Sequence, residues 1–172
     1  MKEILLSLQQ SVDDKNWYGA LIIALTIPDI CSKLENPKEN TNKRYPKWFD
    51  KYINLNYKKH LSGNDCYALR CSYLHQGSHI IEGQPISEVI SKFSFSPEGS
   101  HLCSFINIET GSKDDGKNIC HLSVKSFCED LISSSENWLT DIESNNDIQS
   151  RISEMLKINI VNKLYDSTIL IK

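Results

Sequence analysis

The residues best suited to chemistry lie in the hexad RCSYLH, which runs from position 70 to position 75. Arginine is permanently charged and grips phosphate oxygens with a fork of donors, whereas histidine changes its charge near neutral pH. Together the two side chains could hold a phosphodiester and transfer protons while it is cleaved. Arg70 and His75 are therefore the candidate catalytic residues.

A helix over residues 64–76 is expected to carry this hexad. Asp65 in its first turn suits the positive end of the helix dipole, and Gly77 is typical of a helix end. Apolar residues occupy almost every side of the helix, so Arg70, Ser72 and His75 are expected to lie on a helix surrounded by protein. Asp65 and Ser72 are candidate supporting residues. An unpaired buried charge would cost about 3–5 kcal/mol, so the arginine needs a carboxylate, an interface or a ligand. The candidate carboxylates are Asp29, Glu35 and Asp65.

The spacing within the hexad limits how its two ends can meet. Five residues at about 100° each place Arg70 and His75 about 140° apart around the helix axis. Convergence on one phosphate therefore requires the arginine to reach around the helix, or a second copy of the helix in a two-fold dimer. A purely structural role is the alternative, with Arg70 paired to Asp65 or Asp29 and His75 bonded to a backbone carbonyl.

A second helix, expected over residues 16–35, reads WYGALIIALTIPDICSKLE from Trp17 onward and is apolar on almost every side. This pattern is typical of a helix in the middle of a bundle. Pro28 should kink or divide it, because proline removes the donor for the Ala24 carbonyl. Asp29 would then lie beside an unpaired backbone group inside the core, which makes it a candidate supporting residue.

A helix predicted over residues 43–60 combines aromatic and basic residues. Its aromatic side chains follow helical spacing and are expected to belong to the core. Basic side chains lie on a different side and could follow a phosphate backbone, although such stripes are usually solvated faces. The candidate RNA-binding residues are Arg44, Lys47, Lys51 and Lys58.

The remaining patterns complete a mainly α fold: a helical bundle with a small antiparallel β insertion at about 89–123. Further helices are expected at about 2–13, 124–144 and 147–165, where apolar residues recur at helical spacing. Alternating apolar residues and the turn signals PEGS and GSKDDGKN indicate the strands. No repeat or linker divides the chain, so residues 1–172 are expected to form a single domain.

Six cysteines without a CxxC pair are expected to stay reduced and mostly buried. His101, Cys103, Cys120 and His121 could form a zinc site, and the alternative is that these side chains simply pack within the fold. Cys120 and His121 are adjacent, so on a strand they point to opposite faces and leave at most three convergent ligands. The sequence therefore predicts no metal and no cofactor.

Composition and charge indicate the compartment and the partner class. With 40% hydrophobic and 24% charged residues, the chain has the composition of an ordinary globular domain. The longest nearly pure apolar run is less than half of the roughly 20 residues that cross a bilayer, and no signal-peptide pattern opens the chain. A cytoplasmic protein without membrane contact is expected. The net charge of −3 argues against a nucleic-acid binder, but the basic residues gather between positions 43 and 60.

Three segments resemble the HEPN superfamily of helical-bundle proteins, whose signature is an arginine, four to six residues, and a histidine near the end of a buried helix. The segments are LTIPDICSKLE, RYPKWFDKYI and above all LRCSYLHQG, within residues 17–77. The resemblance implies a homodimer with the motif helix at its interface. In many members it also implies a metal-independent endoribonuclease that acts as a toxin or antiviral effector.

On this resemblance, Arg70 would orient and neutralise the scissile phosphate of RNA. His75 would move protons as the 2′-hydroxyl attacks and the 5′-oxygen leaves, giving a 2′,3′-cyclic phosphate. An inhibitory partner protein is a further expectation for such a toxin. RNA-cleaving members commonly carry a polar residue, often asparagine, directly after the arginine, where this chain has Cys71. The alternative function is a non-catalytic dimeric interaction or nucleotide-binding module.

Overall fold

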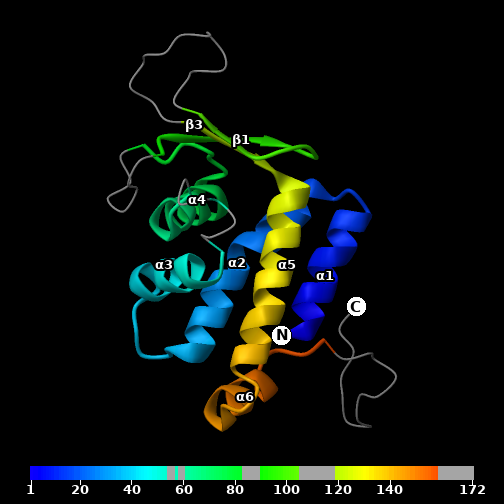
Figure 1. The fold of residues 1–172 in the computed structure, drawn as a ribbon, viewed down its shortest axis with the longest axis vertical. Helices are drawn as coiled ribbons and strands as arrows, with labels where there is room; N and C mark the ends of the chain where they lie inside the picture. The colour runs from blue at the N-terminus through cyan, green and yellow to red at the C-terminus, as the bar shows by residue number, and fades with distance from the viewer. Residues whose placement is uncertain (54–56, 58–60, 83–89, 105–118, 159–172) are drawn as a thin grey trace, which may run out of the picture.

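The computed structural model describes residues 1–53, 57, 61–82, 90–104 and 119–158. These residues form a bundle of helices with a small sheet at one end (Figure 1), which confirms the mainly α fold. The helices are α1 (Lys2–Asp13), α2 (Trp17–Glu35), α3 (Thr41–Tyr52), α4 (Gly63–Gln76), α5 (Val124–Asp141) and α6 (Asn146–Ser153). The strands are β1 (Lys92–Ser96), β2 (Leu102–Ser104) and β3 (Ile119–Ser123).

The central element is α2, which contacts each of the other helices among the described residues. Its apolar residues are buried along most of its length, as expected for a helix with no polar face. By length and composition α2 could also cross a membrane, but half of that stretch is buried inside the protein. Pro28 does not divide it, because the helix runs through the proline from Trp17 to Glu35. Asp29 therefore lies within a continuous helix.

Clear signals begin and end α4, the helix that carries the hexad. The Ser62 side chain accepts a hydrogen bond from the Asp65 amide at the start, and Gly77 ends the helix in the left-handed conformation with φ 65°. Gly63 packs so closely on the backbone of α3 at Pro46 that a side chain would not fit. These contacts fix α4 against α3, and both helices lie beside α2.

The sheet has the order β1-β3-β2, with β3 in the centre. β2 and β3 are antiparallel, but β1 and β3 are parallel, so the prediction of an antiparallel sheet is wrong for that pair. The physical reason is that β3 lies between two strands that are consecutive in the chain. β1 and β2 run in opposite directions, so β3 is antiparallel to β2 and parallel to β1. β3 leads directly into α5, which ties the sheet to the end of the bundle (Figure 1).

Two predicted helices are longer than the observed ones. The helix predicted at 43–60 ends at Tyr52, and residues 54–56 and 58–60 lie outside the described part of the chain. The Gly63 amide donates to the Asp50 carboxylate of this helix at 2.8 Å. The helix predicted at 147–165 ends at Ser153, and residues 159–165 lie outside the described part of the chain. Leu156 is 94% exposed, so the apolar periodicity there does not correspond to packing in the core.

Candidate functional site: an arginine cluster beside an exposed histidine

Arg70 on α4 forms an ion pair with Asp29 on α2. Its Nη2 lies 2.8 Å from Asp29 Oδ2, and each side chain is 20% exposed. Of the three candidate carboxylates, Asp29 is therefore the partner of Arg70. Glu35 instead accepts a hydrogen bond from the indole of Trp138 at 2.8 Å.

Asp65, the third candidate carboxylate, caps the start of α4. One of its oxygens accepts from the Ser62 hydroxyl at 2.8 Å, and the other accepts from the Ile90 amide. Ser72, also a predicted supporting residue, is fully buried, and its carbonyl accepts from the Ser78 amide at the helix end. Both residues shape the helix that carries the site.

Arg44 shares the same carboxylate. Its Nη2 lies 2.7 Å from Asp29 Oδ1, and the Arg44 side chain is only 6% exposed. Further bonds run to the Asp29 carbonyl, the Ser32 hydroxyl and the Thr41 hydroxyl. The prediction that Arg44 lies on an exposed RNA-binding stripe is therefore wrong. The reason is that Asp29 supplies a buried countercharge from a different helix.

The other members of the predicted stripe have different surroundings. Lys47 is exposed and pairs with Glu39. Lys51 is also exposed, donates to the Tyr52 hydroxyl at 2.6 Å, and lies over the Tyr52 ring. This hydrogen bond raises the pKa of Lys51, which therefore stays charged. Lys58 lies outside the described residues.

His75 lies on the surface next to Arg70, so the expectation that protein surrounds it is wrong; it stands in the last turn of α4, where the helix ends. The His75 Nε2 and Arg70 Nη1 atoms are 3.5 Å apart, although the two residues are separated around the helix. Of the two routes considered from sequence, the long arginine reaching around α4 is the one seen within a single chain. The distance is at the limit of a hydrogen bond, so the direct contact is weak.

The cluster of Arg44, Arg70 and Asp29 carries more positive than negative charge, and it has more hydrogen-bond donors than acceptors. Two guanidiniums share one carboxylate, which leaves one positive charge before His75 is counted. The Nε atoms of Arg44 and Arg70 are buried without a hydrogen-bond partner in the described structure. An additional anion would compensate both the charge and the surplus of donors.

Tyr67 and Cys71 flank the cluster on α4. Burial and a hydrogen bond with Cys71 raise the pKa of Tyr67, while the charge of Arg70 opposes this shift. Tyr67 therefore stays protonated at neutral pH and can serve as a hydrogen-bond donor near the arginine. Cys71, the residue directly after the arginine, is half-buried.

Both histidines of the weighed zinc set have protein partners. His101 accepts from the Ser123 amide through Nδ1 and lies beside Tyr57 and Asp130 through Nε2. His121 lies between the hydroxyls of Ser94 and Ser96, at 3.1 and 3.0 Å. Within the described ranges, no group of three or more histidine, cysteine or acidic residues is arranged to hold a metal ion.

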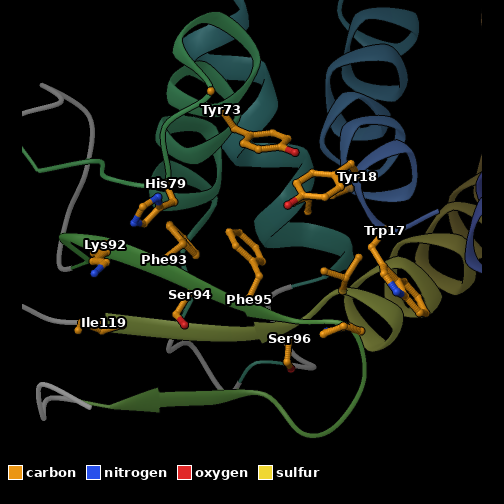
Figure 2. A pocket seen from close by; sticks show the side chains of 14 residues that line it. Trp17, Tyr18, Tyr73, His79, Lys92, Phe93, Ser94, Phe95, Ser96 and Ile119 are labelled. Carbon is orange, nitrogen blue, oxygen red and sulfur yellow. The ribbon is translucent and has the colours of Figure 1, made fainter. Parts of the chain in front are cut away.

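A cavity of about 590 Å³ opens between α2, α4 and β1. Figure 2 shows the rings of Tyr18 and Tyr73 on its helical side and Phe93 and Phe95 rising from β1. Sequence reasoning missed this site, because aromatic residues at helical or alternating spacing read as core. The exposure of Tyr18, which is 78%, becomes visible only in the folded protein.

Comparison of the chain with models of protein families, with curated proteins and with solved structures finds no match.

Proposed function

We propose that this chain is a HEPN-like, metal-independent endoribonuclease that acts in the cytoplasm as a toxin or antiviral effector. The observation that carries the proposal is the position of Arg70 Nη1, 3.5 Å from Nε2 of the exposed His75. This pairing is the one expected for a group that binds a phosphate next to a group that exchanges protons at neutral pH.

Asp29 and Arg44 support the proposed catalytic pair. The Asp29 carboxylate holds Nη2 of Arg70, so Nη1 remains on the side of His75. Arg44 anchors Asp29 from the buried side. Because Arg44 also balances the carboxylate charge, Asp29 does not cancel the positive charge that Arg70 presents to a phosphate. We assign Arg70 to phosphate binding and the other two residues to positioning.

The proposed reaction is an internal transesterification of RNA. The 2′-oxygen forms a bond to phosphorus, the bond from phosphorus to the 5′-oxygen breaks, and a 2′,3′-cyclic phosphate remains. A base takes the proton of the 2′-hydroxyl, and an acid supplies a proton to the 5′-oxygen. His75 can perform one of these transfers, and the equivalent histidine of a second copy can perform the other. The homodimer through α4 is thus part of the proposal.

A second function is favoured by the ion pair that Arg70 already makes. Because Arg70 already has an ion-pair partner in Asp29, which it shares with Arg44, the arginine needs no substrate to be stable where it lies. Cys71 also replaces the polar residue that follows the arginine in RNA-cleaving relatives of the resembled family. A non-catalytic dimeric interaction or nucleotide-binding module would account for both features.

Incubation of the purified protein with labelled RNA in excess chelator tests the proposal. We expect cleavage by the wild-type protein, and loss of at least about 100-fold in His75→Ala, the usual contribution of a general acid or base. Gln76→Ala is a matched control, because Gln76 is the exposed neighbour on the same helix end and carries no assigned role. Cleavage that survives in His75→Ala, or that chelator abolishes, would contradict the proposed chemistry.

A further inference from the structure

We infer that the cavity between α2, α4 and β1 binds a nucleobase of single-stranded RNA beside the Arg70 and His75 pair. The inference rests on the proposed function, since it assigns a place to the base next to the phosphate that is cleaved. Its own support comes from the shape, the lining and the location of the cavity.

The shape and lining suit a planar aromatic group. The volume of about 590 Å³ lies in the range of small-molecule sites, roughly 300–1,000 Å³. Five aromatic side chains line it: Trp17, Tyr18, Tyr73, Phe93 and Phe95. Figure 2 shows the Tyr18 and Tyr73 rings on the helical side, facing Phe95 on the strand. Bases stack on such rings whatever their identity, because every base has a π face.

The charge of the lining suits an anion attached to that aromatic group. The chain has 22 acidic and 19 basic residues, yet none of the lining residues in the described part of the chain is acidic. His79 and Lys92 lie together at one end of it (Figure 2). An aromatic cleft that is lined by a lysine, and by no carboxylate among the described residues, complements a nucleotide, which combines a base with a phosphate.

The location links the cavity to the proposed phosphate site. Tyr73 lines the cavity and follows Arg70 on α4 by three residues, so the two share one face of the helix, and Gly77, which caps the end of the helix, also lines the cavity. Arg70 and Tyr73 are about 4.5 Å apart along the helix axis. One RNA strand could therefore place a base in the cavity while an adjacent phosphate reaches Arg70.

Tyr18 gives the sharpest test, because it is 78% exposed and its removal should not unfold the protein. The probe is a short, fluorescein-labelled, single-stranded RNA of mixed sequence, measured by anisotropy at fixed salt in the His75→Ala background, which keeps the RNA intact. We expect Tyr18→Ala to weaken binding by about 5- to 150-fold, as for loss of one stacked base. Tyr18→Phe keeps the ring and should bind within about twofold of the parent protein.

Leu6→Ala is the matched control. Leu6 on α1 is also a large exposed apolar residue, at 64%, and it is not part of the cavity lining. Its removal should leave RNA affinity unchanged. Circular dichroism and the melting temperature of each variant verify that folding is preserved.

The outcomes separate this inference from the proposed function. Equal RNA affinity in Tyr18→Ala and its parent, or no RNA binding by the parent, would overturn the inference. A change in sedimentation mass without a change in RNA affinity would do the same and would assign the cavity to a second copy of the chain. RNA binding that depends on Tyr18, without RNA cleavage by the wild-type protein, would contradict the proposed ribonuclease activity and leave the base site in place. RNA cleavage by Tyr18→Ala with the same KM as the wild-type protein would contradict the base site and leave the proposed ribonuclease activity in place.

Discussion

The arrangement of two arginines around one carboxylate makes an asymmetric prediction about stability. Asp29→Asn removes the carboxylate that both guanidiniums share within the described part of the chain, while keeping the shape of the side chain. Arg70→Met, in contrast, leaves Asp29 and Arg44 as a balanced pair. The substitution at the carboxylate should therefore destabilise the protein far more than the substitution at the arginine.

The magnitude follows from burial. Loss of one partner of a buried ion pair costs about 3–5 kcal/mol, and the lower end applies here because Asp29 and Arg70 are each 20% exposed. We therefore expect Asp29→Asn to lower the free energy of unfolding by about 3 kcal/mol. Arg70→Met should cost only about 1 kcal/mol, because the pair is partly exposed to solvent, which weakens its charge term, and the methylene packing is kept.

Urea unfolding followed by far-ultraviolet circular dichroism measures both values. With a slope of about 2 kcal/mol per M, Asp29→Asn should shift the midpoint by about 1.5 M and Arg70→Met by about 0.5 M. In the double variant, the cost of Asp29→Asn should fall, because one guanidinium fewer is left unpaired. Equal costs for the two single variants, or a cost below about 1 kcal/mol for Asp29→Asn, would refute the shared-carboxylate description.

Two further predictions concern α4. Gly63→Ala places a Cβ 2.6 Å from Pro46 Cα and should lower the free energy of unfolding by about 2 kcal/mol. Gly77→Ala meets open space and should cost only about 1 kcal/mol, the strain of an alanine at a left-handed φ. Thermal unfolding measures both variants, and a larger loss of stability in Gly77→Ala than in Gly63→Ala would contradict this packing. Burial raises the pKa of Cys66 to about 12, so its thiolate is scarce at neutral pH. Mass spectrometry after iodoacetamide treatment should therefore find the half-buried Cys71 modified before the buried Cys66. This raised pKa also means that the stabilisation from the buried thiol is complete below its unfolded pKa of about 8.5 and is lost as the pH rises above that value.

The sequence was most informative where local physics decides the outcome. The strong apolar character of residues 17–35 predicted the central helix, and Gly77 predicted the end of α4. The need to neutralise a charge inside a bundle pointed to Asp29 as one of three partners for Arg70, and the structure selects it. In each case the signal is contained within one element or follows from a general cost of burial.

The sequence was least informative where partners come from distant segments. Arg44, Lys47 and Lys51 have similar spacing on α3, and only the presence of Asp29 on another helix makes the first of them buried. The alternation in β1 indicated a strand but not its direction, which depends on β3 as a common neighbour. Tyr18 read as a core residue, because nothing local shows that a cavity lies beside it.

Arg70 and His75 are proposed to act together on an RNA phosphate. Mass spectrometry of the ends of the RNA fragments that the wild-type protein produces in excess chelator is the decisive measurement. A 2′,3′-cyclic phosphate on one fragment and a free 5′-hydroxyl on the next, both absent with His75→Ala, is the predicted result. Fragments ending in a 3′-hydroxyl and a 5′-phosphate, or the same products from His75→Ala, would contradict it.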